Sequence, residues 1–172
     1  IIRDFVRVNI IIKRRLTMFI LVLIAAGIVT GVIHQVNIGF GDVSSVCSTL
    51  LLHQFVVTFG LLGIIGTITN IIKAEDNAKM LGWPGGPFQI KYGFSQLGLG
   101  VMGVLCIWFR GGFWLGTLVS MYIYGVSGLW SHIAEMKRQG KPTVNDIGNL
   151  IIDVIYQVFL TVLSVYAGGI WV

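Results

Sequence analysis

The chain has 172 residues, of which 55% are hydrophobic and only 11% charged, and its mean hydropathy is +0.87. A soluble domain of this size needs about a quarter of its residues to be charged in order to cover its surface. The composition therefore excludes an ordinary water-soluble domain and predicts an all-α integral membrane protein, built as a single bundle of transmembrane helices. The net charge of +5 does not indicate nucleic acid, because its distribution follows membrane topology.

Five apolar runs approach or exceed the length of about 20 residues that crosses a bilayer as a helix. The predicted helices cover residues 17–36, 49–72, 92–109, 113–133 and 147–171. Residues 1–15 carry five basic side chains and form either an interfacial helix or a charged flank of the first span. Because the chain begins with Ile, we expect further residues before it, and the first run lacks the small-residue cleavage site of a signal peptide.

The segments between these runs carry residues that end helices. Residues 37–48 are polar, and residues 82–87 contain two prolines and three glycines, which predicts a rigid loop at the membrane surface. A tight turn at residues 110–112 makes the third and fourth helices an antiparallel hairpin. Residues 135–145, with Gly140 and Pro142, form the last polar loop.

The basic residues predict the orientation of this bundle. Eleven Lys and Arg residues fall in the N-terminal flank and in the loops around residues 73–91 and 137–141, whereas the opposite side carries Arg110 alone. Positive loops stay in the cytoplasm, so we expect the N-terminus inside, the C-terminus outside, and a prokaryotic cytoplasmic membrane as the location. The expected interfacial anchors are Trp83, Trp108, Arg110, Trp114, Trp130 and Trp171.

Glycine spacing predicts how the helices pack. Lipid tails are as apolar as leucine, so membrane helices associate through close backbone approach and polar contacts. Many of the 23 glycines recur at three or four residues, which places them on one helix face. They mark tight packing within the chain or an interface with another subunit. The expected packing residues are Gly27, Gly31, Gly60, Gly63, Gly66, Gly100, Gly103, Gly112 and Gly116.

Polar residues at membrane depth are the main candidates for function, because burying an ionisable group without a partner is costly. Asp153 lies about two turns into the last helix, and Gln157 follows one turn later on the same face. We expect one polar cluster of Asp153, Gln157, His132, Gln96, Lys91 and Gln89. It is either a structural pair of Asp153 with Lys91 or His132, or part of an ion or proton path.

A second candidate consists of His34 and His53, near the outer ends of the first two helices. Facing histidines on adjacent helices could ligate a haem or another metal, and the alternative is an ordinary solvated or hydrogen-bonded pair. Cys47 and Cys106 are too few for a disulfide framework or a metal set. Since the chain carries no zinc spacing, nucleophile elbow, P-loop or dinucleotide motif, no catalytic residue is predicted.

Three parts of the chain carry a resemblance. They are Gly82-Trp83-Pro84-Gly85-Gly86-Pro87-Phe88-Gln89, the run from Gly98 to Trp114 that ends in Trp108-Phe109-Arg110-Gly111-Gly112-Phe113-Trp114, and Ser131-His132-Ile133 with the helix of Asp153. In these parts the chain resembles a family of small prokaryotic multi-pass membrane proteins that has no assigned function. The resemblance implies membrane topology and no activity. The chain departs from it by a loop one small residue shorter, without a Ser before the second Pro, and by Lys91 where an acid is usual.

These features leave three classes of function open. The first is a non-catalytic accessory or scaffold subunit of a membrane complex or homo-oligomer, with lipid and other membrane subunits as partners. The second is a small transporter or channel that uses the cluster around Asp153. The third is a haem- or quinone-linked electron carrier that uses His34 and His53. The absence of a catalytic motif favours the first, and bound lipid is the ligand that such a composition implies.

Overall fold

The structure is a computed structural model that describes residues 2–81, 85–140, 142 and 144–171. These residues form helices without a β-strand, which confirms the all-α prediction. In chain order the elements are α1 (Ile2–Ile38), α2 (Val43–His53), the π-helical η1 (Gln54–Phe59), α3 (Gly60–Thr67), the π-helical η2 (Ile68–Ile72), α4 (Ala74–Leu81), α5 (Pro87–Leu105), α6 (Gly112–Gln139) and α7 (Val144–Ala167).

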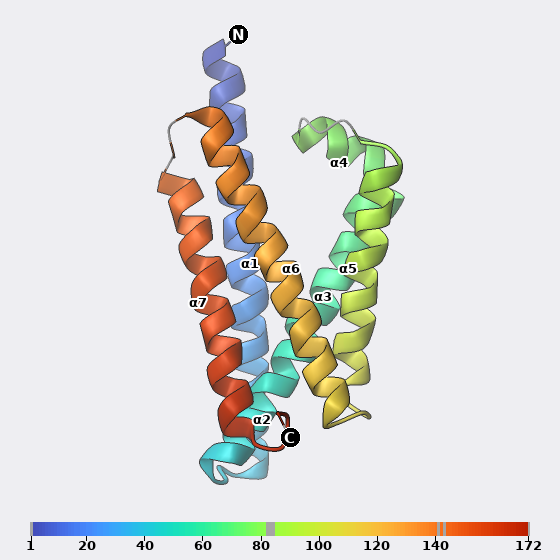
Figure 1. The fold of residues 1–172 in the computed structure, drawn as a ribbon, viewed down its shortest axis with the longest axis vertical. Helices are drawn as coiled ribbons and strands as arrows, with labels where there is room; N and C mark the ends of the chain where they lie inside the picture. Colours follow the sequence, from blue (N-terminus) through green and yellow to red (C-terminus); the bar gives the residue numbers. More distant parts are fainter. Residues whose placement is uncertain (1, 82–84, 141, 143, 172) are drawn as a thin grey trace.

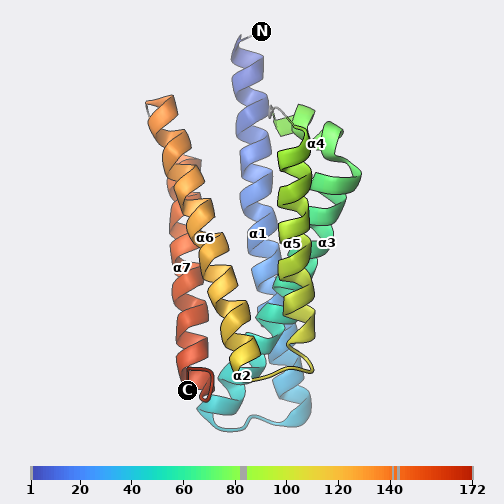
Figure 2. The ribbon, with the colours of Figure 1, turned by 45° about the vertical axis from the view of Figure 1, so that its right-hand side comes forward.

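The long helices run between two ends of one bundle (Figure 1). The N-terminus, α4 and the last turns of α6 lie at one end, and the α1–α2 loop, the α5–α6 turn and the C-terminus lie at the other. α5 packs against α3, α7 packs against α2 and α6, and α1 packs against α2 and η1. A view turned by 45° shows α6 beside α7 and α5 beside α3 (Figure 2). The segments with most of the basic residues therefore share one end.

Four helices among the described residues are long and apolar enough to cross a membrane. They are Ile20–Ile38, Val43–Ile72, Gly112–Ala134 and Ile147–Ala167. The predicted third span corresponds to α5, which is not one of these four. α5 begins earlier than predicted, with Pro87 in its first turn, and therefore adds Gln89 and Lys91 to Gln96. The polarity of these residues offsets the apolar second half of the helix.

Several helix ends differ from the prediction because local signals outweigh hydropathy. α2 begins at Val43 rather than at residue 49, because the Asp42 carboxylate accepts a hydrogen bond of 2.8 Å from Ser45 N and caps the helix. α7 ends at Ala167 rather than at residue 171, because Gly168 and Gly169 adopt positive φ angles of 70° and 65°. α6 continues past the apolar run until Gly140, which takes a left-handed φ of 71°.

The basic N-terminal segment is not a separate interfacial helix in this structure. Residues 2–15 are the first turns of α1, which continues without a break to Ile38. The reason is local, since no glycine or proline occurs before Gly27 to end the helix. Residues 82–84 of the predicted loop 82–87, which include Trp83, lie outside the described residues.

A backbone-to-backbone contact joins α3 and α5 at Gly63 and Gly100. A Cβ placed on Gly100 would lie 2.7 Å from Gly63 Cα, and one placed on Gly63 would lie 2.7 Å from Gly100 Cα. Gly103 lies against the Phe55 carbonyl in the same way. Because no side chain separates the two backbones here, dispersion contacts act along their whole crossing, as expected for helices in lipid.

Large apolar side chains fill the rest of the interior. Phe55 and Phe59 from η1 are fully buried, and the Phe55 ring meets the Trp114 ring edge-on with the centroids 5.5 Å apart. Leu118 of α6 and Leu160 of α7 belong to the same cluster. The core thus joins the η1 segment to the α6–α7 pair.

We predict that Gly100→Ala destabilises the protein by about 1–3 kcal/mol, because the new methyl group would overlap the Gly63 backbone in a packed interface. Thermal unfolding in detergent, followed by near-UV circular dichroism, measures the loss. The matched control is Gly98→Ala, two residues away on α5, where an added Cβ meets no atom within 4 Å among the described residues. Equal midpoints for the two variants would contradict the packing described here.

Candidate functional site

The residues of the expected polar cluster lie in two separate groups. Gln89 and Gln96 lie on the face of α5 that packs on η2 and α4, whereas Asp153 and Gln157 lie on α7 facing α6. The structure therefore places these residues in two groups rather than in the one cluster expected from the sequence. Lys91 belongs to neither group, since it lies on the exposed side of α5, two residues from Gln89 and about 200° away around the helix.

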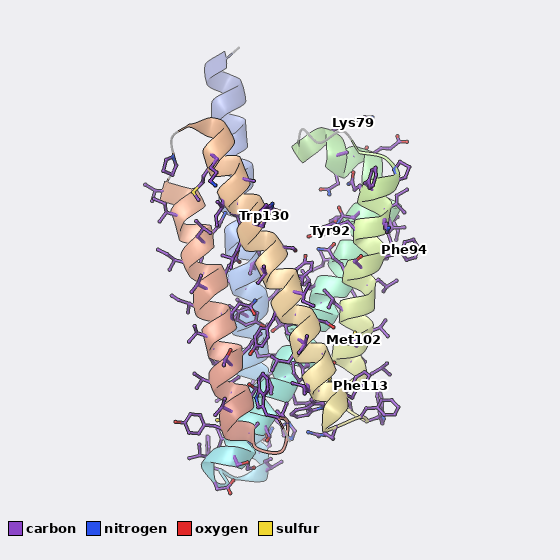
Figure 3. The ribbon with its side chains drawn as sticks, in the orientation of Figure 1. Lys79, Tyr92, Phe94, Met102, Phe113 and Trp130 are labelled. Atoms are coloured by element: carbon purple, nitrogen blue, oxygen red, sulfur yellow. The ribbon has the colours of Figure 1, made fainter. Side chains whose placement is uncertain are left out.

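The first group is a hydrogen-bonded network between η2, α5 and α6. Asn70 Nδ2 donates to Gln96 Oε1 at 2.8 Å, and Gln96 Nε2 donates to the Tyr124 hydroxyl at 2.7 Å. The hydroxyls of Tyr124 and Tyr92 are 2.7 Å apart, and their rings are stacked. Figure 3 shows Tyr92 on the side of α5 that faces α6 and Phe94 on the outer side. This network ties three helices together through buried amides.

The network continues toward the end of the bundle. Asn77 Nδ2 donates to Asn70 Oδ1 at 3.1 Å, and Gln89 Nε2 donates to the Ala74 carbonyl at 3.0 Å. Gln89 Oε1 is buried and has no hydrogen-bond donor among the described residues. The amides therefore anchor α4 to the start of α5, and Gln89 Oε1 is the one acceptor of this group without a donor among the described residues.

The second group lies between α6 and α7. His132 Nε2 is 3.7 Å from Asp153 Oδ2, which is the structural pairing that the sequence offered as one of two partners for this acid. Asp153 Oδ2 and Gln157 Oε1 are both buried without a hydrogen-bond donor among the described residues. Gly128 and Gly125 on α6 face these two side chains. Two acceptor oxygens on successive turns of α7 thus face two glycines of α6, and the His132 imidazole is the polar group of α6 beside them.

His34 and His53 contact each other directly. His34 Nδ1 and His53 Nε2 are 2.9 Å apart, and the rings meet edge-on with centroids 5.2 Å apart. His53 Nδ1 is 3.0 Å from Thr30 Oγ1. A haem held between two axial histidines needs its iron and its porphyrin between the ligating nitrogens, and this pair leaves no such space. The residues therefore do not fit the haem that the sequence suggested.

The tryptophans expected at the interface take two different positions. Trp108 and Trp130 are 66% and 77% exposed, and Trp171 is also exposed, with Nε1 bonded to Ser164 Oγ at 3.1 Å. Trp114 is instead buried at 3% exposure, and its Nε1 donates to the Cys106 carbonyl at 3.0 Å. The exposed Arg110 guanidinium stacks over the Trp114 ring at 4.5 Å. Trp114 is a core residue because it falls on the face of α6 that packs on η1.

The expected packing glycines also divide into two groups. Seven of them face a neighbouring helix closely enough that an added Cβ would meet it within 3.4 Å: Gly27, Gly31, Gly60, Gly63, Gly66, Gly100 and Gly103. Gly112 and Gly116 differ, since an added Cβ there would meet no atom within 4 Å among the described residues. These two pack against no helix in the part of the chain that the structure describes, because they lie on the side of α6 that faces away from the bundle.

A third polar group was missed by the sequence analysis. Gln54 begins η1, its Oε1 accepts a hydrogen bond of 3.0 Å from the Tyr156 hydroxyl of α7, and it is fully buried. The Thr58 hydroxyl donates to the Leu23 carbonyl of α1 at 3.1 Å. A signal was available, because Gln54 and Asn70 are the two amides within the apolar run 49–72. Each stands in one of the two π-helical segments, which are often found at functional sites.

An all-helical chain with four apolar helices of spanning length defines a membrane protein of the helix-bundle class. Within that class, the chain belongs to the family of unknown function DUF6790, whose match covers residues 15–168. This confirms the resemblance to a family without an assigned function. No curated protein and no solved structure matches the chain.

We predict that Tyr124→Phe destabilises the protein on the order of 1 kcal/mol, because it leaves Gln96 Nε2 without its acceptor. Unfolding in mixed micelles by increasing sodium dodecyl sulfate measures the change. Tyr122→Phe is the matched control, two residues away on α6, because its hydroxyl bonds Thr161 Oγ1 at an exposed site. A larger loss for the control would show that the amide network does not hold these helices.

Proposed function

We propose that this protein is a non-catalytic transmembrane subunit that binds other membrane helices, either copies of itself or other membrane proteins. The observation that supports this proposal is the outward face of α6, opposite the core residue Trp114. Gly112, Gly116 and Ser120 follow one another at four-residue spacing on that face. A surface that only contacts lipid gains nothing from small residues, whereas a helix interface needs them for close backbone approach.

The same stripe continues along α6 toward its other end. The hydroxyls of Ser120, Ser127 and Ser131 each bond a carbonyl of their own helix, at 2.8, 2.7 and 2.8 Å. These serines therefore present a small surface with satisfied hydrogen bonds to whatever lies outside. Exposed Ile123 and Trp130 lie on the same face, and their larger side chains would interdigitate with a partner helix.

The glycines inside the bundle show what such a stripe can do. At Gly63 and Gly100 the same residue type brings two helices of this chain into backbone contact. Gly112 and Gly116 have the spacing for an equivalent contact and lack an intramolecular partner in the described part of the chain. A second copy of the chain or another transmembrane subunit would supply the missing helix.

We further propose that α5 is a fifth span and that the N-terminus faces the cytoplasm of a prokaryotic cell. α5 runs between the same two ends of the bundle as its neighbours (Figure 1), which supports the first point. Eleven of the twelve basic residues belong to the N-terminal flank and to the two polar loops of one side, which supports the second. Lipid would then contact the exposed apolar side chains all around the bundle.

We predict that Gly116→Leu breaks the assembly and leaves the subunit folded, because the added side chain projects away from the bundle and fills the groove that a partner helix needs. Native gel electrophoresis and mass photometry after extraction in mild detergent report the size of the assembly. Gly98→Leu, at an exposed glycine of α5, is the matched control and keeps the assembly intact. A monomeric wild-type protein without partners would refute the proposal.

A second candidate function is the passage of a cation or proton along the α6–α7 interface. The supporting observation is the pair of buried acceptors, Asp153 Oδ2 and Gln157 Oε1, that lack a donor among the described residues. A carboxylate at this depth favours binding of a proton or cation, since its negative charge is poorly solvated in an apolar surrounding. His132, at 3.7 Å, is the neighbouring group able to exchange a proton with it.

For this second function we predict that Asp153→Asn abolishes proton or sodium flux in proteoliposomes, because the amide keeps the shape of the side chain and removes its charge. Fluorescent pH and sodium indicators inside the vesicles measure the flux. Asp42→Asn, at the exposed cap of α2, is the control acid outside the interface. Flux that is unchanged by Asp153→Asn would eliminate this candidate.

A further inference from the structure

We propose that His34 and His53 form a binding site for a divalent transition-metal ion, with Cu²⁺ as the ion that fits best. The site lies where α1 meets α2, at the end of the bundle opposite the N-terminus (Figure 1). Both histidines are half-buried, so an ion and its water ligands can reach them. Neither residue is used by the α6 interface or by the Asp153 group.

The distance between the two nitrogens suits a shared ion. His34 Nδ1 and His53 Nε2 are 2.9 Å apart. Two imidazole nitrogens bound at about 2.05 Å and at a right angle to one another are also about 2.9 Å apart. The ion would lie beside the line that joins the nitrogens, so each nitrogen must aim about 45° away from the present hydrogen bond. The rings must therefore turn, but the helices need not separate.

The hydrogen bonds determine which nitrogen of each ring carries its proton. The Thr30 hydroxyl donates to the Ala26 carbonyl at 2.8 Å, so its oxygen accepts from His53 Nδ1–H at 3.0 Å. His53 Nε2 is then a lone pair that accepts from His34 Nδ1–H. A metal-bound histidine has this same arrangement, with its second nitrogen held by a neighbouring oxygen.

Binding of the ion requires one proton to move. His53 already offers a lone pair at Nε2, and His34 offers one at Nδ1 once its proton moves to its own Nε2 through solvent. Both rings stay neutral and no net proton is released. Two nitrogen–metal bonds form while two water ligands leave the ion and the hydrogen bond between the rings breaks. His34 is half-buried and lies four residues before the end of α1 at Ile38, next to the polar α1–α2 loop, where water can take part in this exchange.

The backbone around the pair is held in place before any ion binds. Gly31 lets α2 approach α1, since an added Cβ there would lie 2.9 Å from Leu50 Cδ2 and 3.3 Å from His53 Cβ. Gln35, which is 1% exposed, donates from Nε2 to the Ser45 carbonyl at 3.2 Å and so joins the end of α1 to the start of α2. Little conformational freedom is therefore lost when the two imidazoles bind one ion.

The number and type of ligands select the class of metal. Imidazole suits copper, nickel and zinc, and affinity in this series is greatest for Cu²⁺, which accepts two nitrogens at a right angle with water in its other positions. Among the described residues no group of three or more His, Cys, Asp or Glu side chains surrounds a common point. The site is therefore a two-histidine site that holds an exchangeable ion.

The test is titration of the tag-free protein in detergent with Cu²⁺, followed by electron paramagnetic resonance. We expect one Cu²⁺ per chain with coupling to two nitrogens. His53→Gln, which retains a hydrogen-bonding side chain, should abolish this signal, and His34→Ala should do the same. His132→Ala removes the third histidine of the chain and is the matched control, with an unchanged signal.

A variant that keeps both ligands separates orientation from ligation. Thr30→Val removes the oxygen that holds His53 Nδ1, and we expect Cu²⁺ affinity to fall about 10–100-fold with two-nitrogen coupling retained. Circular dichroism and gel filtration verify that each variant is folded. Wild-type protein that binds no Cu²⁺, or binding that persists in the His34→Ala/His53→Gln double variant, would overturn the proposal.

Discussion

The structure depends on the contact between α3 and α5 at Gly63 and Gly100. Helices in hydrocarbon gain nothing from hiding apolar side chains from lipid, so their association relies on dispersion at short range and on polar contacts. Glycine supplies the short-range dispersion, because it lets two backbones touch. Without this crossing, the face of α5 that bears Gln96 would lose its position against η2.

Buried amides supply the polar contacts. They occur in the two π-helical segments, η1 and η2, of the helical run Val43–Ile72. Gln54 in η1 reaches Tyr156 of α7, and Asn70 in η2 reaches Gln96 of α5. A π-helical turn widens the helix and shifts the register of the side chains that follow it. One continuous helical run, Val43–Ile72, can therefore face α1 and α7 at one end and α5 at the other (Figure 1).

The sequence predicts the helices better than their faces. Apolar run length was sufficient to find four spans, but it could not show that α7 stops at Gly168 or that Asp42 caps α2, since those ends depend on single residues. The face that each helix turns toward the protein interior is harder to predict, because lipid and protein interior are equally apolar. Trp114 therefore resembled an interfacial anchor, and the exposed step Gly112–Gly116 resembled the packed step Gly27–Gly31. The amides Gln54 and Asn70 were visible as polar breaks in an apolar run, but their partners lie on distant helices.

The central claim is that five helices cross the membrane with the N-terminus inside. Its most direct test is labelling of single cysteines with a membrane-impermeant maleimide in intact cells, in a background without the native cysteines. We predict that Phe40→Cys and Arg110→Cys react, and that Asp76→Cys reacts only after the membrane is permeabilised. Protection of Arg110→Cys in intact cells would show that α5 does not cross, and reaction of Asp76→Cys there would contradict the orientation.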